Sequence, residues 1–349
     1  MDNINYKRYF GASNSASGFV NYFPQIFCAG TCSRIYVIKG GPGTGKSRFM
    51  REVANEAEAR GMTVRYYYCS SDADSLDGII IEEMRIGFVD GTAPHVCEPT
   101  LVGAFEQIIN LGEFWDEKKL AIERERIAEL SQKKSNAYSR AYFLLSAYGG
   151  IEKAIESKLS TCINAKKLNS AVKRLLHKLP QGNGEECEIA IRSSVGMSGE
   201  RSFDSYERES KILFFVTDCH STAHFVMRAI LDEAKARNMP LCVSYDPIMS
   251  DRPDAIMLKD CGISFVCGVG GERVINSKRF VDEEKFREVK DGVKALESEC
   301  RALRRAALQT FAEVKKYHFE LEDIYISAMD FERKEQYTRE FIKNLFLFD

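Results

Sequence analysis

Eight consecutive residues have the types and the spacing of a phosphate-binding loop. They read GGPGTGKS and match G-x-x-x-x-G-K-S, with Lys46 and Ser47 at the last two positions. In such a loop the backbone N–H groups surround phosphate oxygens, the lysine reaches the β- and γ-phosphates, and the hydroxyl ligates Mg²⁺. We therefore expect ATP and Mg²⁺ as cofactors. The residues expected to contact the nucleotide are Gly40, Gly41, Gly43, Thr44, Gly45, Lys46, Ser47 and Arg48.

The flanking sequence predicts the strand and the helix that this kind of loop requires. Residues 35–38 form a short apolar run, and residues 63–69 form a second one that is rich in β-branched and aromatic side chains. Between the loop and Gly61, apolar side chains recur at a helical spacing, and Gly61 is suited to end that helix. The order strand, loop, helix favours a phosphate site over an ordinary glycine-rich turn.

A third apolar run, residues 86–90, ends in Asp90. In P-loop proteins an aspartate at the end of a neighbouring strand helps to hold Mg²⁺. We therefore expect Asp90 to hold the metal through water, opposite Ser47. The alternative is that Asp90 and Gly91 only begin a turn, since this dipeptide is common in turns.

Acidic residues after the second predicted strand are candidates for the catalytic base. The segment CSSDADSLDG, residues 69–78, follows that strand directly, and the carboxyl ends of parallel strands line the ligand crevice. Asp72 or Asp74 would orient a water or accept a proton, whereas the alternative is a polar helix cap. Glu82 and His95 are further candidates for the site. The expected catalytic set is Lys46, Asp90 and Asp72.

The second half of the chain repeats the first. Residues 34–91 align without a gap with residues 211–268, and 16 of the 58 aligned positions are identical. Farther along, FWDEKKL at 114–120 matches FVDEEKF at 280–286, and both copies continue into charged helical segments. This pattern predicts a tandem duplication.

The second copy has lost the phosphate-handling residues. In the alignment Thr217 replaces Gly40, Thr222 replaces Gly45, Ala223 replaces Lys46, His224 replaces Ser47 and Cys267 replaces Asp90. We therefore expect this copy to keep the fold without binding nucleotide. The alternative for the same stretch, VTDCHSTAHF, is a metal site, because His220 and His224 are four residues apart and lie beside Cys219 and Asp218.

These patterns predict an α/β fold made of two tandem P-loop NTPase units, each with a mostly parallel sheet flanked by helices. An appended helical arm follows each unit, at residues 116–178 and 282–345. The predicted domains are residues 1–180, with the intact loop, and residues 187–349, with the degenerate loop. Residues 179–186 have the Pro, Gly and polar character of a linker.

Composition and charge narrow the possible functions. The formal net charge of −2 gives no overall basic field, which argues against nucleic acid as a partner. No apolar run is long enough to span a membrane, so no membrane partner is expected. The 11 cysteines are scattered, without a C-x-x-C pair, and this indicates a reduced, cytoplasmic protein.

The chain resembles a poorly characterised bacterial family of tandem P-loop ATPases. The resemblance rests on KGGPGTGKS (39–47), CSSDADSLDG (69–78), DGTAPH (90–95) and INLGEFWDE (109–117), and it covers nearly the whole chain because the duplication is part of it. It implies ATP binding but no particular substrate or pathway. This chain departs from the two-site pattern, because its second loop is not a Walker A sequence.

The function expected is that of a Mg²⁺-dependent ATPase at the first unit, with a nucleotide-silent second copy. Hydrolysis would move the helical arms against each other, against a protein partner or against a second copy of the chain. The residue after Asp90 is Gly91 rather than Glu, which leaves the base open. Two alternatives remain: a small-molecule kinase with Asp72 and Asp74 at the acceptor site, and a nucleotide-gated scaffold without turnover.

Overall fold

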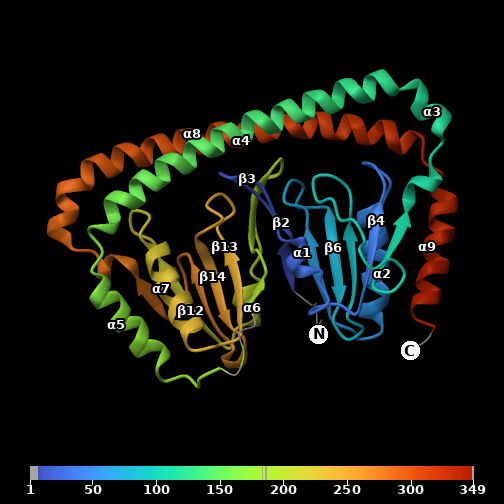
Figure 1. Ribbon diagram of the computed structural model, residues 1–349. Coiled ribbons are helices and arrows are strands. Elements are labelled where there is room, and N and C mark those ends of the chain that lie inside the picture. Colours follow the sequence, from blue (N-terminus) through green and yellow to red (C-terminus); the bar gives the residue numbers. More distant parts are fainter. Residues whose placement is uncertain (1–6, 183, 185–186, 348–349) are drawn as a thin grey trace.

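The computed structural model describes residues 7–182, 184 and 187–347, which form two similar halves beneath a pair of long helices (Figure 1). The elements of the first half are β1 (Arg8–Phe10), β2 (Ala12–Ser15), β3 (Gly18–Asn21), α1 (Phe23–Ile26), β4 (Arg34–Lys39), α2 (Lys46–Ala59), β5 (Val64–Tyr68), β6 (Leu76–Ile81), β7 (Ile86–Asp90), β8 (Glu106–Asn110) and the 3₁₀ helix η1 (Leu111–Phe114). Those of the second half are β9 (Cys187–Ile189), β10 (Ser193–Gly196), β11 (Gly199–Ser202), α6 (Ser205–Glu209), β12 (Ile212–Thr217), α7 (Ala223–Ala236), β13 (Leu241–Tyr245), β14 (Pro253–Leu258), η2 (Lys259–Cys261), β15 (Ile263–Cys267), β16 (Val274–Asn276) and η3 (Ser277–Phe280).

The two halves contain six-stranded sheets with the same strand order. The first sheet runs β1-β5-β6-β7-β4-β8 and the second runs β9-β13-β14-β15-β12-β16. Most neighbouring pairs are parallel, which confirms the predicted α/β class with mostly parallel sheets. However, β6 and β14 are antiparallel to both of their neighbours. The connection between β5 and β6, residues 69–75, is too short for a parallel crossover, which needs a dozen or more residues.

The strand and helix that flank the glycine loop form where the sequence predicts them. The β4 residues Ile35–Ile38 are buried because other strands pair on both sides of β4 and helices cover the sheet. On α2 the buried residues are Phe49, Met50, Val53, Ala54 and Ala57, which is the predicted apolar face. These contacts fix the strand and the helix, and so they fix the two ends of the loop.

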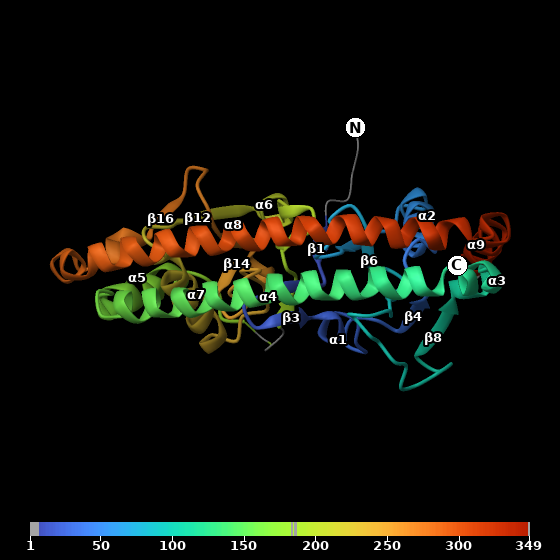
Figure 2. The same ribbon diagram turned by 90° about the horizontal axis from the view of Figure 1, so that it is seen from above.

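Five helices form the arms: α3 (Glu117–Ile122), α4 (Arg124–Ser160), α5 (Ala165–Leu176), α8 (Glu283–Ser327) and α9 (Phe331–Leu345). The two long ones, α4 and α8, run side by side across both halves in two perpendicular views (Figures 1 and 2). Leu145 and Phe311 are fully buried in their contact. Despite their length, neither of them nor any other helix in the described part of the chain is apolar enough to cross a membrane.

The arms exchange their last helices between the halves. α5, which follows α4, packs Leu168, Val172 and Leu176 in one apolar cluster with α7 of the second half. α9, which follows α8, packs on α2 of the first half, where Phe341 meets Phe49 at a ring distance of 5.3 Å. Of the predicted linker, Asn183, Glu185 and Glu186 lie outside the described residues.

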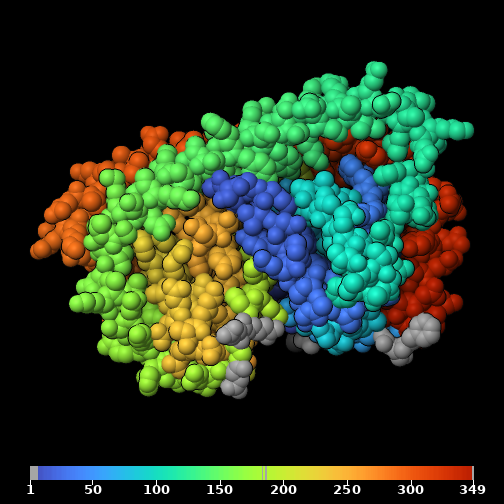
Figure 3. Space-filling model, viewed as in Figure 1, coloured from blue at the N-terminus to red at the C-terminus, as the bar shows by residue number. Residues whose placement is uncertain are grey.

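The N-terminal segment packs between the two sheets. In the space-filling view the dark-blue N-terminal residues lie directly against the yellow second half (Figure 3). The hairpin β2–β3 meets the hairpin β10–β11, where Asn14 Nδ2 donates a hydrogen bond to the Val195 carbonyl oxygen at 2.7 Å. Phe10, Tyr67 and Tyr206 belong to one buried cluster that spans both halves. The two halves therefore share a hydrophobic core as well as the arms.

Candidate functional site

The glycine loop joins the carboxyl end of β4 to the first turn of α2. Gly43 and Gly45 have φ angles of +71° and +80°, a left-handed conformation that glycine adopts without strain. Gly45 is the N-cap residue of α2, and no side chain caps the helix. The N–H groups of the first turn therefore carry the positive end of the helix dipole without a side-chain acceptor. This geometry is suited to bind an anion.

Lys46 and Asp90 meet beside this loop. Lys46 Nζ donates hydrogen bonds to the carbonyl oxygens of Gly40 and Gly41, at 2.9 and 2.8 Å. It also lies 3.5 Å from Asp90 Oδ2, because β7 is the neighbour of β4 in the sheet. Burial raises the pKa of the Asp90 carboxyl, and the Lys46 ammonium opposes that shift.

Ser47 and Asp90 have oxygen atoms suited to the predicted Mg²⁺. Ser47 Oγ accepts a hydrogen bond from the Leu76 N–H at 3.0 Å, so its hydroxyl faces the end of β6. Asp90 Oδ1 accepts hydrogen bonds from the N–H and the hydroxyl of Thr92, at 2.9 and 2.6 Å. Its Oδ2 faces Lys46. Hydroxyl and carboxylate oxygens are the ligand types that Mg²⁺ prefers, so the residues present fit the ion.

The remaining predicted loop residues make mainly structural contacts. Thr44 is fully buried, and its hydroxyl donates to the Gly41 carbonyl oxygen at 2.9 Å. Arg48 points outward, where it pairs with Glu52 and Glu335, each at 2.9 Å. The structure therefore places Arg48 in an ion network between α2 and α9 rather than on the loop.

The end of α8 covers the loop. A Cβ at Gly43 would lie 2.9 Å from both the Glu322 carbonyl oxygen and Ile326 Cγ1. A Cβ at Gly41 would lie 3.1 Å from the Trp115 ring and 3.3 Å from the ring of Tyr325. The absence of a side chain at these two positions therefore lets α8 and Trp115 pack closely on the loop, in addition to allowing the loop conformation.

Asp77 is a site residue that sequence reasoning missed. The antiparallel register of β6 and β7 places it beside Asp90. Asp77 Oδ2 lies 3.0 Å from His95 Nε2, and both side chains are about 6% exposed. The available signal was the repeat, because Asp77 is identical to its counterpart Asp254 although the other acidic site position, Asp90, is not kept.

Cys69, Asp77 and His95 form a compact buried cluster. In the part of the chain that the structure describes, it is the one set of three His, Cys, Asp or Glu residues close enough to share a metal ion, with ligand atoms within 4.8 Å of one another. Burial raises the pKa of the Cys69 thiol well above its usual value. Burial lowers the pKa of His95, but the Asp77 carboxylate outweighs this and raises it overall. The contact between His95 Nε2 and Asp77 Oδ2 gives each of these two side chains a partner within the cluster.

The other acidic candidates lie in three different places. Asp72 is half-buried, and its Oδ1 accepts a hydrogen bond from the Ser198 hydroxyl of the second half at 3.3 Å. Asp74 is exposed. Glu82 follows the far end of β6 and accepts a hydrogen bond from Lys7 Nζ at 2.7 Å. Of the three, Asp72 is the one whose charge acts on Glu322, the α8 residue whose carbonyl oxygen lies at Gly43.

The arms bring further charged groups over the loop. Lys134 on α4 lies 3.3 Å from His318 Nδ1 on α8. Burial, together with the charges of Lys134 and Lys46, lowers the pKa of His318 to about 4. Burial also raises the pKa of Glu322, while a hydrogen bond from the Gly43 backbone opposes that shift. These groups come from distant segments and have no signal in a local motif.

In the second half the corresponding loop is closed by a carboxylate of the chain itself. Asp218 Oδ1 accepts a hydrogen bond from the N–H of Ala223, the first residue of α7, at 2.8 Å. Its Oδ2 accepts one from the Ser221 N–H at 3.0 Å. The N-terminus of α7 therefore already has an anionic partner, which is the role that a phosphate would take.

His220 and His224 point to different partners. His220 Nδ1 lies 3.1 Å from Glu297, and His224 Nε2 lies 3.6 Å from Glu156. The two histidines do not appear together in any described cluster with metal-binding spacing. Burial, with the nearby charge of Arg252, lowers the pKa of His224 to about 4.

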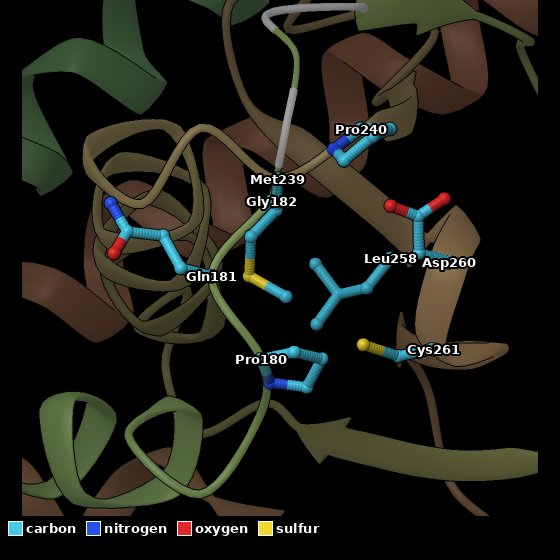
Figure 4. A pocket seen from close by; sticks show the side chains of 8 residues that line it. All are labelled: Pro180, Gln181, Gly182, Met239, Pro240, Leu258, Asp260 and Cys261. Carbon is cyan, nitrogen blue, oxygen red and sulfur yellow. The ribbon is translucent and has the colours of Figure 1, made fainter.

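Two hollows on the surface differ in their relation to the loop. A small pocket with a mostly apolar lining lies at the opposite, amino end of the second sheet's parallel strands, and Asp260 is its one charged residue (Figure 4). An open cleft of about 640 Å³ lies between η1 and the α8–α9 connection. Trp115, which packs on the glycine loop, lines this cleft together with Phe114, Phe331 and Arg333. Of these two hollows, the cleft is therefore the one that adjoins the candidate site.

Comparison with known proteins gives one partial match. The family model described as Nephrocystin 3, N-terminal, matches residues 23–80, which include β4, the glycine loop, α2 and β5. This is a minor part of the chain and shows a similarity of that segment. Neither the curated proteins nor the solved structures gave a match.

Proposed function

We propose that this protein binds ATP with Mg²⁺ at residues 40–47 and hydrolyses it. The observation that carries the proposal is the uncapped N-terminus of α2, which has Lys46 and Asp90 beside it. The second half supports the same reading by contrast, since Asp218 fills the equivalent position there. The match of residues 23–80 to one family model covers the glycine loop of the first half and does not reach the second half.

Each residue has a role in this proposal. The loop N–H groups and Lys46 bind the β- and γ-phosphates, while Ser47 and Asp90 hold Mg²⁺, which neutralises charge on the phosphates. Asp72 orients the attacking water and accepts its proton. The water oxygen bonds to the γ-phosphorus as the bond to the β–γ bridging oxygen breaks, so ADP and phosphate leave. Asp77 and His95 hold the buried end of the site beside Asp90.

A second function is favoured by the cleft beside Trp115. Its aromatic and charged lining is suited to an organic acceptor, which is what a small-molecule kinase would bind. The predicted acceptor pair, Asp72 and Asp74, is not supported in this way, because Asp74 is exposed whereas Asp72 is half-buried. We keep hydrolysis as the main proposal for that reason.

We also propose that the arms carry the output of the site, to a protein partner or to a second copy of the chain. α8 lies on the loop at Gly43, so a γ-phosphate that enters there changes the contacts of α8. Large apolar side chains are exposed on the arms, at Ile122 and Phe143. In the scaffold alternative this movement follows from binding alone, without turnover.

The test compares the wild type with Lys46→Ala, and uses Lys173→Ala on the exposed face of α5 as the matched control. We expect Mg²⁺-ATP to raise the melting temperature of the wild type and of the control but not that of Lys46→Ala. Phosphate release without an added acceptor supports hydrolysis. Release that requires a metabolite extract supports a kinase, and binding without release supports the scaffold. Equal ATP affinity and turnover in all three proteins would contradict the nucleotide site.

A further inference from the structure

Lys334 is a buried lysine whose ammonium group has no hydrogen-bond partner. It lies in the first turns of α9 and is 1% exposed. Its Nζ is buried and unsatisfied, and no carboxylate lies within ion-pair distance of it among the described residues. A cation in this state is rare, because removing a charge from water without a partner is costly and favours the neutral form of the group. Burial does lower its pKa.

The side chain ends at the glycine loop. A Cβ at Gly45 would lie 3.6 Å from Lys334 Cε and 3.7 Å from its Nζ. Gly45 is the N-cap of α2, so the ammonium lies at the positive end of the helix dipole. The ammonium group of Lys46 lies at the other end of the loop, where it donates hydrogen bonds to the carbonyl oxygens of Gly40 and Gly41.

The nearest carboxylates do not neutralise this group. Glu52 and Glu335 are the acidic residues whose charge acts on Lys334. Both already pair with Arg48, each at 2.9 Å, on the outer side of α2 and α9. Two lysines and a helix N-terminus thus converge on the loop. The partner that Lys334 lacks is an anion.

We propose that Lys334, which the second half of the chain supplies through α9, binds the phosphate chain of the nucleotide at the glycine loop of the first half. The inference rests on the proposed function for the identity of the anion, whereas the need for an anion rests on Lys334 itself. The ligand class is a polyphosphate, which is long enough to place one negative group near Lys334 at Gly45 and another near Lys46 at Gly40 and Gly41. The site of the first half is complete only when α9 is docked on α2.

The second half gives an internal comparison. In the repeat, Leu168 on α5 corresponds to Lys334 on α9, since both are the fourth residue of their helix. Leu168 packs in an apolar cluster with α7, and the anion at the α7 N-terminus is Asp218. The half with an internal carboxylate therefore has leucine at this position. The half with an open helix N-terminus has lysine.

The test uses Lys334→Met, which keeps the length of the side chain, and Lys343→Met as a control on the exposed face of the same helix. The two probes are Mg²⁺-ATP and inorganic pyrophosphate, titrated by calorimetry and by thermal shift. We expect Lys334→Met to weaken both ligands by about 10-fold or more, as for a lost charge-assisted hydrogen bond. We also expect the unliganded Lys334→Met protein to melt at a higher temperature than the wild type, because an unpaired buried charge is gone.

The outcomes separate this inference from the proposed function. If the wild type binds pyrophosphate but not ATP, and Lys334→Met loses pyrophosphate, the lysine site stands and the ATP proposal fails. If Lys334→Met binds both ligands as tightly as Lys343→Met does, the inference is overturned while the ATP proposal stands. If the wild type binds neither ligand, both are overturned. A structural role alone would lower both the melting temperature and the affinity, whereas we expect them to change in opposite directions.

Discussion

Replacing Arg252 with glutamine should destabilise the protein strongly, because Arg252 neutralises two carboxylates at the closed loop of the second half. Its Nη1 lies 2.6 Å from Glu152 and its Nη2 lies 2.9 Å from Glu156, both on α4. The side chains of Arg252 and Glu152 are 9% and 8% exposed. Removing one partner of a buried pair leaves the other charge without compensation and costs roughly 3–5 kcal/mol.

The matched control is Arg126→Gln. Arg126 and Glu320 form an ion pair of 2.6 Å between α4 and α8, but they are 45% and 33% exposed. Exposed pairs of this kind contribute about 0–1 kcal/mol. The double variant Glu152→Gln with Arg252→Gln should recover part of the loss, because it removes a buried charge of each sign.

The assay is chemical denaturation followed by circular dichroism, together with thermal melting. For a chain of 349 residues the conversion is about 1–2 °C per kcal/mol, so Arg252→Gln should lower the melting temperature by on the order of 5 °C, and Arg126→Gln by about 1–2 °C at most. If the two single variants differ by less than about 1 kcal/mol, the Arg252 network does not hold α4 on the second half.

Two further predictions concern His224 and Gly43. Burial lowers the pKa of His224 to about 4, so the unfolded state binds more protons than the folded state between pH 4 and about 6.5. The free energy of unfolding should therefore decrease as the pH is lowered from about 6.5 to 4, by on the order of 3 kcal/mol at most, and His224→Gln should reduce this loss in denaturation curves. An equally steep fall in that variant would assign the effect to other groups. Gly43→Ala should lower both stability and ATP affinity, because its φ is +71° and its Cβ would lie 2.9 Å from Ile326 Cγ1. The control Gly292→Ala, on the open face of α8, should leave ATP affinity unchanged and raise stability by about 0.5–1 kcal/mol through helix propensity. Unchanged melting and binding in Gly43→Ala would refute the close contact.

The local part of the fold was predictable because short segments specify it. The apolar run at Ile35–Ile38, the helical spacing after the loop and Gly61 placed β4, α2 and its end within a few residues. The alignment of residues 34–91 with 211–268 likewise placed β12, β13, β14 and β15 at the positions of β4, β5, β6 and β7, although β9 and β16 lie outside it. These features depend on residues close together in the sequence, so the spacing of apolar residues predicts them well.

The antiparallel direction of β6 and β14 was not predicted. A buried strand has the same apolar pattern whichever way it runs, so LDGIII contains no direction signal. A strand at residues 76–81 was not expected from the sequence, which was interpreted as passing from the strand at 63–69 to the one at 86–90; the short connection at residues 69–75 decides the direction of β6 in the structure.

The groups over the loop could not be found from a motif because they arrive from the exchanged arms. Lys134 precedes and His318 follows the whole second sheet in sequence, and Lys334 lies almost 300 residues after Gly45. Only the crossing of α4 and α8, and the docking of α9 on α2, bring them together. The spacing of charges along an amphipathic helix gives no sign of the half on which it will pack.

The number of nucleotides bound per chain tests the central claim most directly. In calorimetric titration with Mg²⁺-ATP we expect one site per chain in the wild type and none in Lys46→Ala, because only the first half has an uncapped helix N-terminus beside a lysine. Ala223→Lys should not create a second site, since Asp218 still occupies the N-terminus of α7. Two sites in the wild type, or one site that remains in Lys46→Ala, would contradict the account.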